Sequence, residues 1–122
     1  MKKILLVEDD PFLIEIYTAK LENAGFSVDV VSDGDMVINK MKEIKPDLVV
    51  LDIVLPNIDG WEILREIKRN EEFKDVKIVI LSNLSEKEDV EKGIKEGADK
   101  YLIKSHYEPS QVVEEIEEVL NN

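Results

Sequence analysis

Carboxylates stand directly after strongly apolar runs in this sequence. Glu8, Asp9 and Asp10 follow the run ILLV, and Asp52 closes the run LVVL. A carboxylate is costly to remove from water and contributes little to packing, so these positions need a chemical reason. Close carboxylates also repel one another unless a cation neutralises them. Oxygen ligands without cysteine or histidine indicate a hard cation, and Mg²⁺ is the ion that we expect.

Two further polar side chains follow apolar runs later in the chain. Ser82 comes after KIVIL, and Lys104 comes after KYLI. Each has an ordinary explanation when taken alone, Ser82 as a turn residue and Lys104 as a solvated lysine. The acids have one too, because carboxylates stabilise helix N-termini and cap turns. Their joint occurrence at the ends of separate apolar runs favours one shared site.

The apolar runs have the length and β-branched composition of buried strands. We predict five strands, at residues 3–7, 27–31, 47–52, 77–81 and 100–103. The segments between them have apolar residues at helical spacing, which predicts helices near 11–24, 34–44, 60–70, 86–96 and 109–120. This alternation predicts an α/β fold, a doubly wound open sheet of five parallel strands with helices on both faces. A closed barrel would need about eight such units.

A parallel sheet would bring these distant residues together. All its strands point the same way, so residues just past their carboxyl ends gather at one edge, where open α/β folds bind ligands. We therefore expect the acids at 8–10 to meet Asp52, Ser82 and Lys104 at that edge.

Composition narrows the classes of partner. The chain has 16 Lys and Arg against 28 Asp and Glu, a formal net charge of −12 that repels nucleic acid and anionic lipid. It has no cysteine, which suits a reducing compartment. The apolar start is far shorter than a signal peptide or a membrane span of about 20 residues. We expect a cytoplasmic protein, one domain over residues 1–122, with proteins or cations as partners.

Four segments together resemble a known family. ILLVEDDP, LVVLDIVLPNIDG, IVILSN and GADKYLIKS resemble, in this order and spacing, the receiver domain of two-component response regulators, the CheY-like group of flavodoxin-like folds. The resemblance covers essentially the whole chain. It implies a signalling switch rather than an enzyme, catalysing only its own phosphorylation and dephosphorylation.

The resemblance implies a role for each acid. Asp52 would accept a phosphoryl group from the histidine of a sensor kinase or a His-phosphotransfer protein. Mg²⁺ would be held by Asp9, Asp52 and the backbone carbonyl of Val54, with Glu8 acting mainly through metal-bound water. The positive charge would neutralise the phosphoryl oxygens, which in-line attack by a carboxylate requires.

The remaining site residues would read out the modification. Lys104 would pair with a phosphoryl oxygen, and Ser82 and the backbone amide of Asn83 would hydrogen-bond to others. Tyr101 would fill the space that Ser82 leaves as it moves, linking the site to the surface formed by residues 86–96, 100–103 and 109–120. Tyr101 also has an ordinary explanation as an edge-strand aromatic.

Some positions depart from the family's usual pattern. Ser105 stands where the family usually has proline after the lysine, and Asn83 stands where many members have alanine. Val54 and Leu84 occupy positions that tend to govern hydrolysis of the acyl phosphate in this family, and neither can hydrogen-bond an attacking water. We predict a comparatively long-lived phosphorylated state. His106 is interpreted as a loop residue.

The leading hypothesis is a stand-alone receiver. The alternative is that the chain is an excised piece of a longer regulator. Its output would run through a partner protein, through homodimerisation on the surface of residues 86–96, 100–103 and 109–120, or through relay of the phosphoryl group. The main alternative is a pseudo-receiver that binds partners without phosphorylation. A flavin carrier is disfavoured because the charges of EDDP repel phosphate, and a phosphohydrolase because it normally needs a cap or a substrate pocket.

Overall fold

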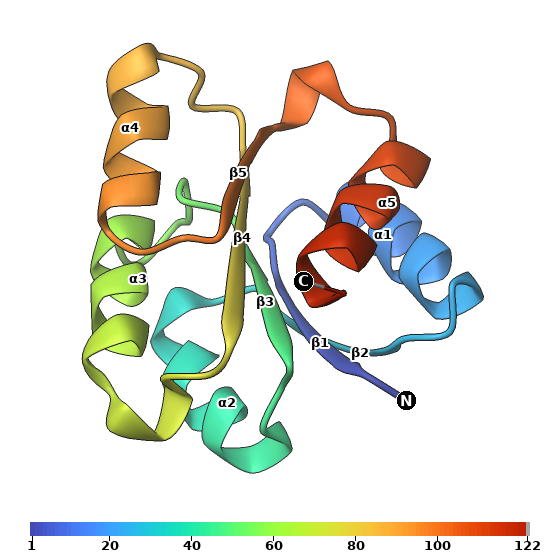
Figure 1. Cartoon of the computed structure of the whole chain (residues 1–122), viewed down its shortest axis with the longest axis horizontal. Coiled ribbons are helices and arrows are strands. Elements are labelled where there is room, and N and C mark those ends of the chain that lie inside the picture. Colours follow the sequence, from blue (N-terminus) through green and yellow to red (C-terminus); the bar gives the residue numbers. More distant parts are fainter. Residues whose placement is uncertain (122) are drawn as a thin grey trace.

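The computed structural model describes residues 1–121, which are built around one parallel sheet (Figure 1). Its five strands follow the order β2-β1-β3-β4-β5. The strands are β1 (Lys3–Val7), β2 (Ser27–Val31), β3 (Leu48–Leu51), β4 (Lys77–Ser82) and β5 (Lys100–Ile103). The predicted five-stranded parallel architecture is confirmed.

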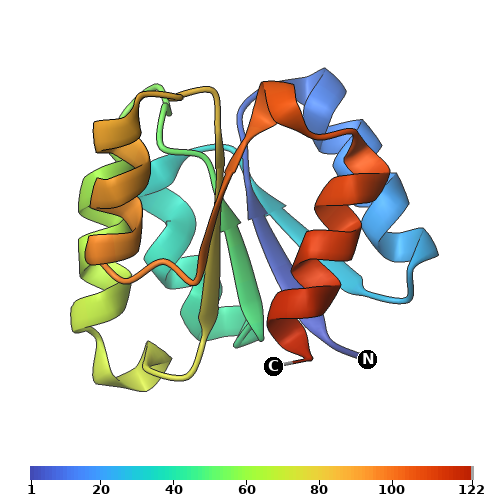
Figure 2. The same cartoon turned by 45° about the horizontal axis from the view of Figure 1, so that its top comes forward.

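Five α-helices connect and cover the strands: α1 (Pro11–Asn23), α2 (Val37–Ile44), α3 (Gly60–Arg69), α4 (Lys87–Lys95) and α5 (Pro109–Leu120). Figures 1 and 2 show α1 and α5 on one face of the sheet and α2, α3 and α4 on the other. This is the doubly wound arrangement expected when crossovers between parallel strands keep one hand. Within residues 1–121, no helix has both the length and the apolar character needed to cross a membrane.

The core consists of one apolar cluster on each face of the sheet. One cluster packs the sheet against α2 and α3, and the other packs it against α1 and α5. The central strand β3 is buried along its whole length because it has helices on both faces. The sheet is therefore packed on both faces, and its carboxyl edge fixes the positions of the residues that directly follow the strands.

Local capping explains where several elements begin. The Asp10 side chain accepts hydrogen bonds from the backbone N–H groups of Phe12 and Leu13, and Pro11 occupies the first turn of α1. The segment predicted as a helix from residue 34 begins as a short 3₁₀ turn, Gly34–Met36. The Asp33 side chain accepts from Asp35 N–H there, which favours the tighter turn before α2 starts.

Helix α4 rests on its neighbours through few apolar contacts. Gly93 is buried, and a Cβ added there would lie 2.6 Å from Tyr101 Cδ2 and 2.9 Å from Ile80 Cδ1. Ile94 exposes 50% of its surface. Toward α3, the contacts are polar. Lys92 Nζ lies 4.6 Å from the centre of the Trp61 ring, and Arg65 forms a 3.7 Å ion pair with Glu96.

Candidate functional site

Two buried carboxylates lie at the carboxyl edge of the sheet. Asp52 directly follows β3 and is 5% exposed, and Glu8 directly follows β1 and is 1% exposed. The Asp52 backbone N–H donates to the Val7 carbonyl at 3.1 Å, which extends the ladder between the two strands by one bond. The strand pairing thus fixes both acids side by side, as the sequence predicted.

Lys104 joins these two acids. Its Nζ lies 2.7 Å from Glu8 Oε1 and 2.7 Å from Asp52 Oδ2. The lysine side chain is largely buried, because it reaches from the end of β5 across the end of β4. A buried ammonium is tolerated here because both of its partners are carboxylates within hydrogen-bond distance.

The pKa values follow from burial and from this pairing. Burial raises the pKa of Glu8, and its hydrogen bonds to Lys104 and to the Asp10 backbone only partly offset that rise. Burial alone would lower the pKa of Lys104, but the hydrogen bonds to Asp52 and Glu8 outweigh it and the pKa is raised. Lys104 therefore stays protonated throughout the neutral range.

A third carboxylate completes an acidic pocket made of Glu8, Asp9 and Asp52. Each offers an oxygen, and the three oxygens lie within 4.8 Å of one another. Asp9 is exposed to solvent, whereas the other two are buried. Three carboxylates and one ammonium, when all are ionised, leave two uncompensated negative charges. An all-oxygen pocket with this charge is compatible with a divalent metal ion.

Existing hydrogen bonds restrict which oxygens a metal could use. Glu8 Oε1 pairs with Lys104, and Glu8 Oε2 accepts the backbone N–H groups of Asp9 and Asp10, both at 3.1 Å. Asp52 Oδ1 accepts the Val54 N–H at 3.0 Å. Glu8 is thus the acid most fully occupied by protein donors, and Asp9 faces the solvent from which an ion would arrive.

Ser82 and Tyr101 both form hydrogen bonds to Leu84, in the loop between β4 and α4. Ser82 ends β4 and is fully buried, and its Oγ accepts the Leu84 N–H at 3.3 Å. The Tyr101 hydroxyl donates to the Leu84 carbonyl at 2.8 Å. Burial, followed by the negative charges of Asp89 and Asp52, raises the pKa of Tyr101 to about 12. The Tyr101 side chain is therefore turned inward, toward the loop.

The other residues singled out in the sequence lie around this centre. Val54 is 56% exposed beside Asp52, and Asn83 is exposed beside Ser82. Leu84 is partly buried and packs against the core cluster on the α2 and α3 face. His106 is exposed in a short 3₁₀ turn after β5, as a loop residue would be.

Sequence reasoning missed one feature of the site. The Glu8–Lys104 ion pair was not anticipated, because no sequence pattern says how far a lysine side chain will reach across a sheet edge. The peptide bond between Lys104 and Ser105 is trans, as are all those in residues 1–121. Lys104 reaches both acids with serine at position 105.

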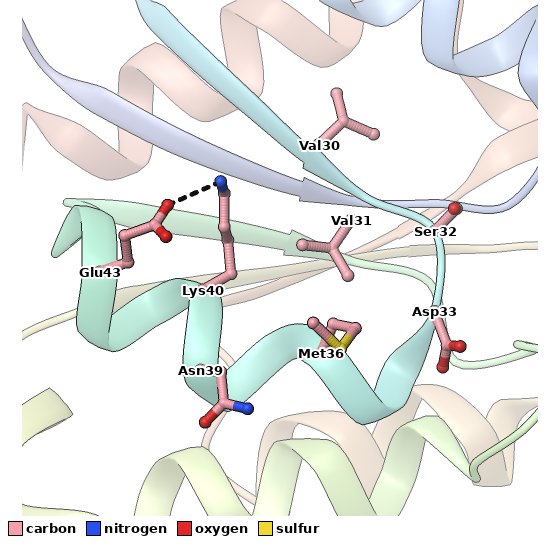
Figure 3. Close-up of a pocket in the computed structure, with 8 residues that line it drawn as sticks. All are labelled: Val30, Val31, Ser32, Asp33, Met36, Asn39, Lys40 and Glu43. Carbon is pink, nitrogen blue, oxygen red and sulfur yellow. Dashed lines mark hydrogen bonds and ion pairs between the residues drawn. The ribbon is translucent and has the colours of Figure 1, made fainter.

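A separate hollow lies between the edge strand β2 and α2 (Figure 3). It has a volume of about 380 Å³, and an ion pair of 2.8 Å between Lys40 and Glu43 forms part of its wall. Asp33 and Met36 from the turn after β2 line its other end. None of the three acidic pocket residues lines it, so it is distinct from the site above.

Comparison with known proteins agrees with this geometry. Residues 4–117 match the family model of the response regulator receiver domain. The DNA-binding response regulator MtrA of Mycolicibacterium smegmatis is 36% identical over 112 residues, 92% of this chain and 47% of that protein. The transcriptional regulatory protein BaeR of Escherichia coli is 36% identical over 118 residues, 97% of this chain and 48% of that protein. The chain thus spans about half the length of these curated relatives.

Solved structures give the same result. The BeF3-activated N-terminal receiver domain of Klebsiella pneumoniae RstA superposes with a TM-score of 0.90 at 30% identity, covering 99% of this chain and 100% of that one. The Mn(2+)-bound form of response regulator Rcp1 superposes with a TM-score of 0.84 at 29% identity, covering 96% and 92%. With its acidic pocket at the carboxyl edge of a 2-1-3-4-5 sheet, the chain belongs to the response regulator receiver domain family.

Proposed function

We propose that this receiver is a phosphorylation-controlled switch in which Asp52 accepts a phosphoryl group from the phosphohistidine of a sensor kinase or a His-phosphotransfer protein. One observation carries the proposal. The buried Asp52 carboxylate lies 2.7 Å from the Lys104 ammonium and shares a pocket with the acids Glu8 and Asp9. A buried carboxylate with a cation on one side and metal-ligand oxygens on the other is suited to receive a negatively charged group.

The transfer forms one bond and breaks one. An Asp52 oxygen bonds to phosphorus as the phosphorus–nitrogen bond of the phosphohistidine breaks, and the bonding electron pair stays on the imidazole nitrogen. Catalysis of such a step consists mostly of positioning and charge neutralisation. In the phosphorylated state, Lys104 pairs with one phosphoryl oxygen, while the Ser82 hydroxyl and the Asn83 backbone N–H donate to others.

Asp9, Asp52 and the Val54 backbone carbonyl are the groups proposed to hold Mg²⁺, with Glu8 acting mainly through a bound water. The hydrogen bonds that already occupy both Glu8 oxygens support this division. When bound, Mg²⁺ supplies the positive charge that neutralises phosphoryl oxygens. The Mn(2+)-bound form of the relative Rcp1 supports a divalent ion in this family.

The switch is proposed to run through Ser82 and Tyr101. Ser82 moves toward the phosphoryl group to donate its hydroxyl, and Tyr101 occupies the space beneath α4. The inward position of Tyr101 and its hydrogen bond to Leu84 support this coupling. A local change of charge would thereby alter the surface formed by α4, β5 and α5, where a downstream protein or a second copy of the chain would bind.

Residues 1–122 act as one receiver domain in this proposal, in the cytoplasm and without direct contact to nucleic acid or membrane. Residue 122 lies outside the described part of the chain. Phosphorylation of Asp52 would work in the same way in a stand-alone receiver and in one joined to an output domain. The relatives named above are DNA-binding or transcriptional regulators.

The test is phosphorylation by a small donor. The protein is incubated with acetyl phosphate and Mg²⁺, and its intact mass is measured. We expect a gain of one phosphoryl group, which should not occur when the metal is chelated beforehand or in Asp52→Asn. Asp75→Asn serves as the control, because Asp75 is exposed and lies outside the pocket. A well-folded protein that gains no phosphoryl group would indicate the alternative, a pseudo-receiver that works by binding alone.

A further inference from the structure

The loop between β3 and α3, residues 52–59, is held firmly at both ends. At its start, Asp52 continues the strand pairing with β1. At its end, the Gly60 N–H donates to the Ile53 carbonyl at 3.1 Å, and a Cβ on Gly60 would collide with the Ile53 backbone. The middle of the loop carries Val54, whose carbonyl is proposed to bind the metal. The Val54 N–H donates to Asp52 Oδ1 at 3.0 Å, but the part of the loop after Val54 needs a further contact to fix its position.

That contact comes from the turn after β2, which Figure 3 shows at Asp33. The Asn57 side-chain amide donates to Asp33 Oδ2 at 3.2 Å. Next to it, the Ile58 side chain lies directly over Gly34, so that a Cβ on Gly34 would collide with Ile58 Cγ2. We call this pair of contacts the Gly34–Ile58 seat. It joins two loops that are distant in sequence, and it includes none of the three acids of the pocket.

Gly34 is needed there for space and not for backbone conformation. Among residues 1–121, the glycines with positive φ are Gly25 and Gly97, and Gly34 is not one of them. A side chain at position 34 would therefore be allowed by the backbone, and would reduce the chain entropy that glycine loses on folding. It is excluded by Ile58 and also by Ile63, whose Cδ1 would lie 2.8 Å from the added Cβ.

We propose that Gly34 and Asp33 are positioning residues for the phosphorylation site, seating Ile58 and Asn57 so that the loop presents the Val54 carbonyl to the metal. This inference rests on the proposed function. Mg²⁺ requires nearly ideal octahedral geometry, so a small displacement of one carbonyl ligand weakens binding. Groups outside the ligand set that orient metal ligands commonly have such effects.

The central experiment compares the wild type with Gly34→Ala. The added methyl group displaces Ile58 and shifts the loop. We expect the Kd for Mg²⁺, measured by calorimetry, to rise about tenfold, the lower end of the losses seen for outer positioning groups. In the metal-free protein, we expect faster hydrogen exchange of the Val54 amide, which in the wild type donates to Asp52 Oδ1. This second readout depends neither on phosphorylation nor on the metal.

A second change should recover part of the affinity for Mg²⁺ if the seat is the cause. Ile58→Ala removes the Cγ2 that the new methyl group meets, so the double variant should bind Mg²⁺ more tightly than Gly34→Ala alone. Ile116→Val is the control for lost stability, because Ile116 is buried in α5 on the other face of the sheet. It should lower the unfolding midpoint and leave the Kd unchanged. Asn57→Ala, at an exposed side chain, should raise the Kd by about threefold through loss of one hydrogen bond.

The outcomes separate the two proposals. If the wild type binds no Mg²⁺ and accepts no phosphoryl group, the proposed function is wrong, and amide exchange still tests the seat. If Gly34→Ala is folded and has the wild-type Kd and Val54 exchange rate, the seat does not position the loop. Should Gly34→Ala fail to fold, Asn57→Ala decides by the same two measurements, and wild-type values for both would overturn the inference.

Discussion

Lys104 Nζ lies 2.7 Å from Asp52 Oδ2, although strand β4 separates β3 from β5 in the sheet. The ammonium therefore bridges over the end of β4 and ties one edge strand to the centre of the sheet. The same nitrogen lies 2.7 Å from Glu8 Oε1 at the end of β1. One side chain thus connects three strand ends, and its charge stabilises the acidic pocket before any metal or phosphoryl group is present.

Replacing Lys104 with methionine should show how much the acidic pocket depends on the charge of this lysine. Lys104→Met keeps the length of the side chain and removes its charge, leaving two buried carboxylates unpaired. We expect the free energy of unfolding to fall by about 2 kcal/mol at neutral pH, as measured by urea denaturation. The loss should shrink in acid, where the carboxylates are protonated in both proteins, and saturating Mg²⁺ should recover part of it. A loss of equal size at all pH values would point to packing instead of charge.

Asp9 should matter for the affinity for Mg²⁺ and hardly at all for the stability of the fold. Its side chain is exposed and lies beside two other acids, so Asp9→Asn removes repulsion and buries nothing new. We expect stability within about 0.5 kcal/mol of the wild type, together with a clearly weaker affinity for Mg²⁺ in calorimetry. Asp75→Asn should change neither. A wild-type affinity in Asp9→Asn would remove Asp9 from the proposed ligand set.

The inward position of Tyr101 predicts that its phenol ionises only at high pH. Its pKa is raised to about 12, so its phenol should stay neutral where a free tyrosine ionises, and Tyr101→Phe should remove the most alkaline part of the tyrosinate absorbance curve. The folded state holds this proton more tightly than the unfolded state. Tyr101 therefore stabilises the fold below the ordinary tyrosine pKa of about 10, and that contribution is lost as pH rises from there toward 12. If Tyr101→Phe removes amplitude near pH 10, the side chain is exposed in solution.

Gly93 and Tyr101 should be strongly coupled in stability. Alanine is normally favoured over glycine inside a helix by about 1 kcal/mol, but at position 93 its Cβ would lie 2.6 Å from Tyr101 Cδ2. We expect Gly93→Ala to destabilise the wild type, and to cost much less in a Tyr101→Ala background, where only the contact with Ile80 Cδ1 at 2.9 Å remains. A double-mutant cycle by urea denaturation measures this difference. Additive effects would show that α4 and Tyr101 do not share this space.

The lifetime of the phosphorylated state should depend on Val54. This side chain is 56% exposed next to Asp52 and offers no hydrogen bond to water. In Val54→Asn, the amide can orient an attacking water, so we expect loss of the phosphoryl mass to be severalfold faster. Leu84→Glu should act in the same direction. It should also cost stability because Leu84 packs against the core, so the single Val54 variant is the clearer test. An unchanged rate would remove the idea that this position shields the phosphoryl group.

Much of this architecture could be predicted because the strand and helix patterns are strong and local. The apolar runs of β3 and β4 have few alternatives to a buried parallel strand, and parallel strands necessarily bring Glu8, Asp52, Ser82 and Lys104 to one edge. Boundaries were less certain where a side chain competes with the helix, as Asp33 does before α2. The space requirements at Gly34 and Gly93 could not be predicted, since they depend on which distant side chain packs against each glycine.

The polar contact between α3 and α4 has a consequence for how the molecule responds to its surroundings. The cation over the Trp61 ring and the Arg65–Glu96 pair are interactions that water and dissolved ions can replace at little cost, unlike an interlocked apolar interface. Just beyond α4, Gly97 has a φ of +109°, where the chain turns sharply into β5. The contact between α3 and α4 should therefore weaken as ionic strength rises, because dissolved ions screen both of its charged interactions.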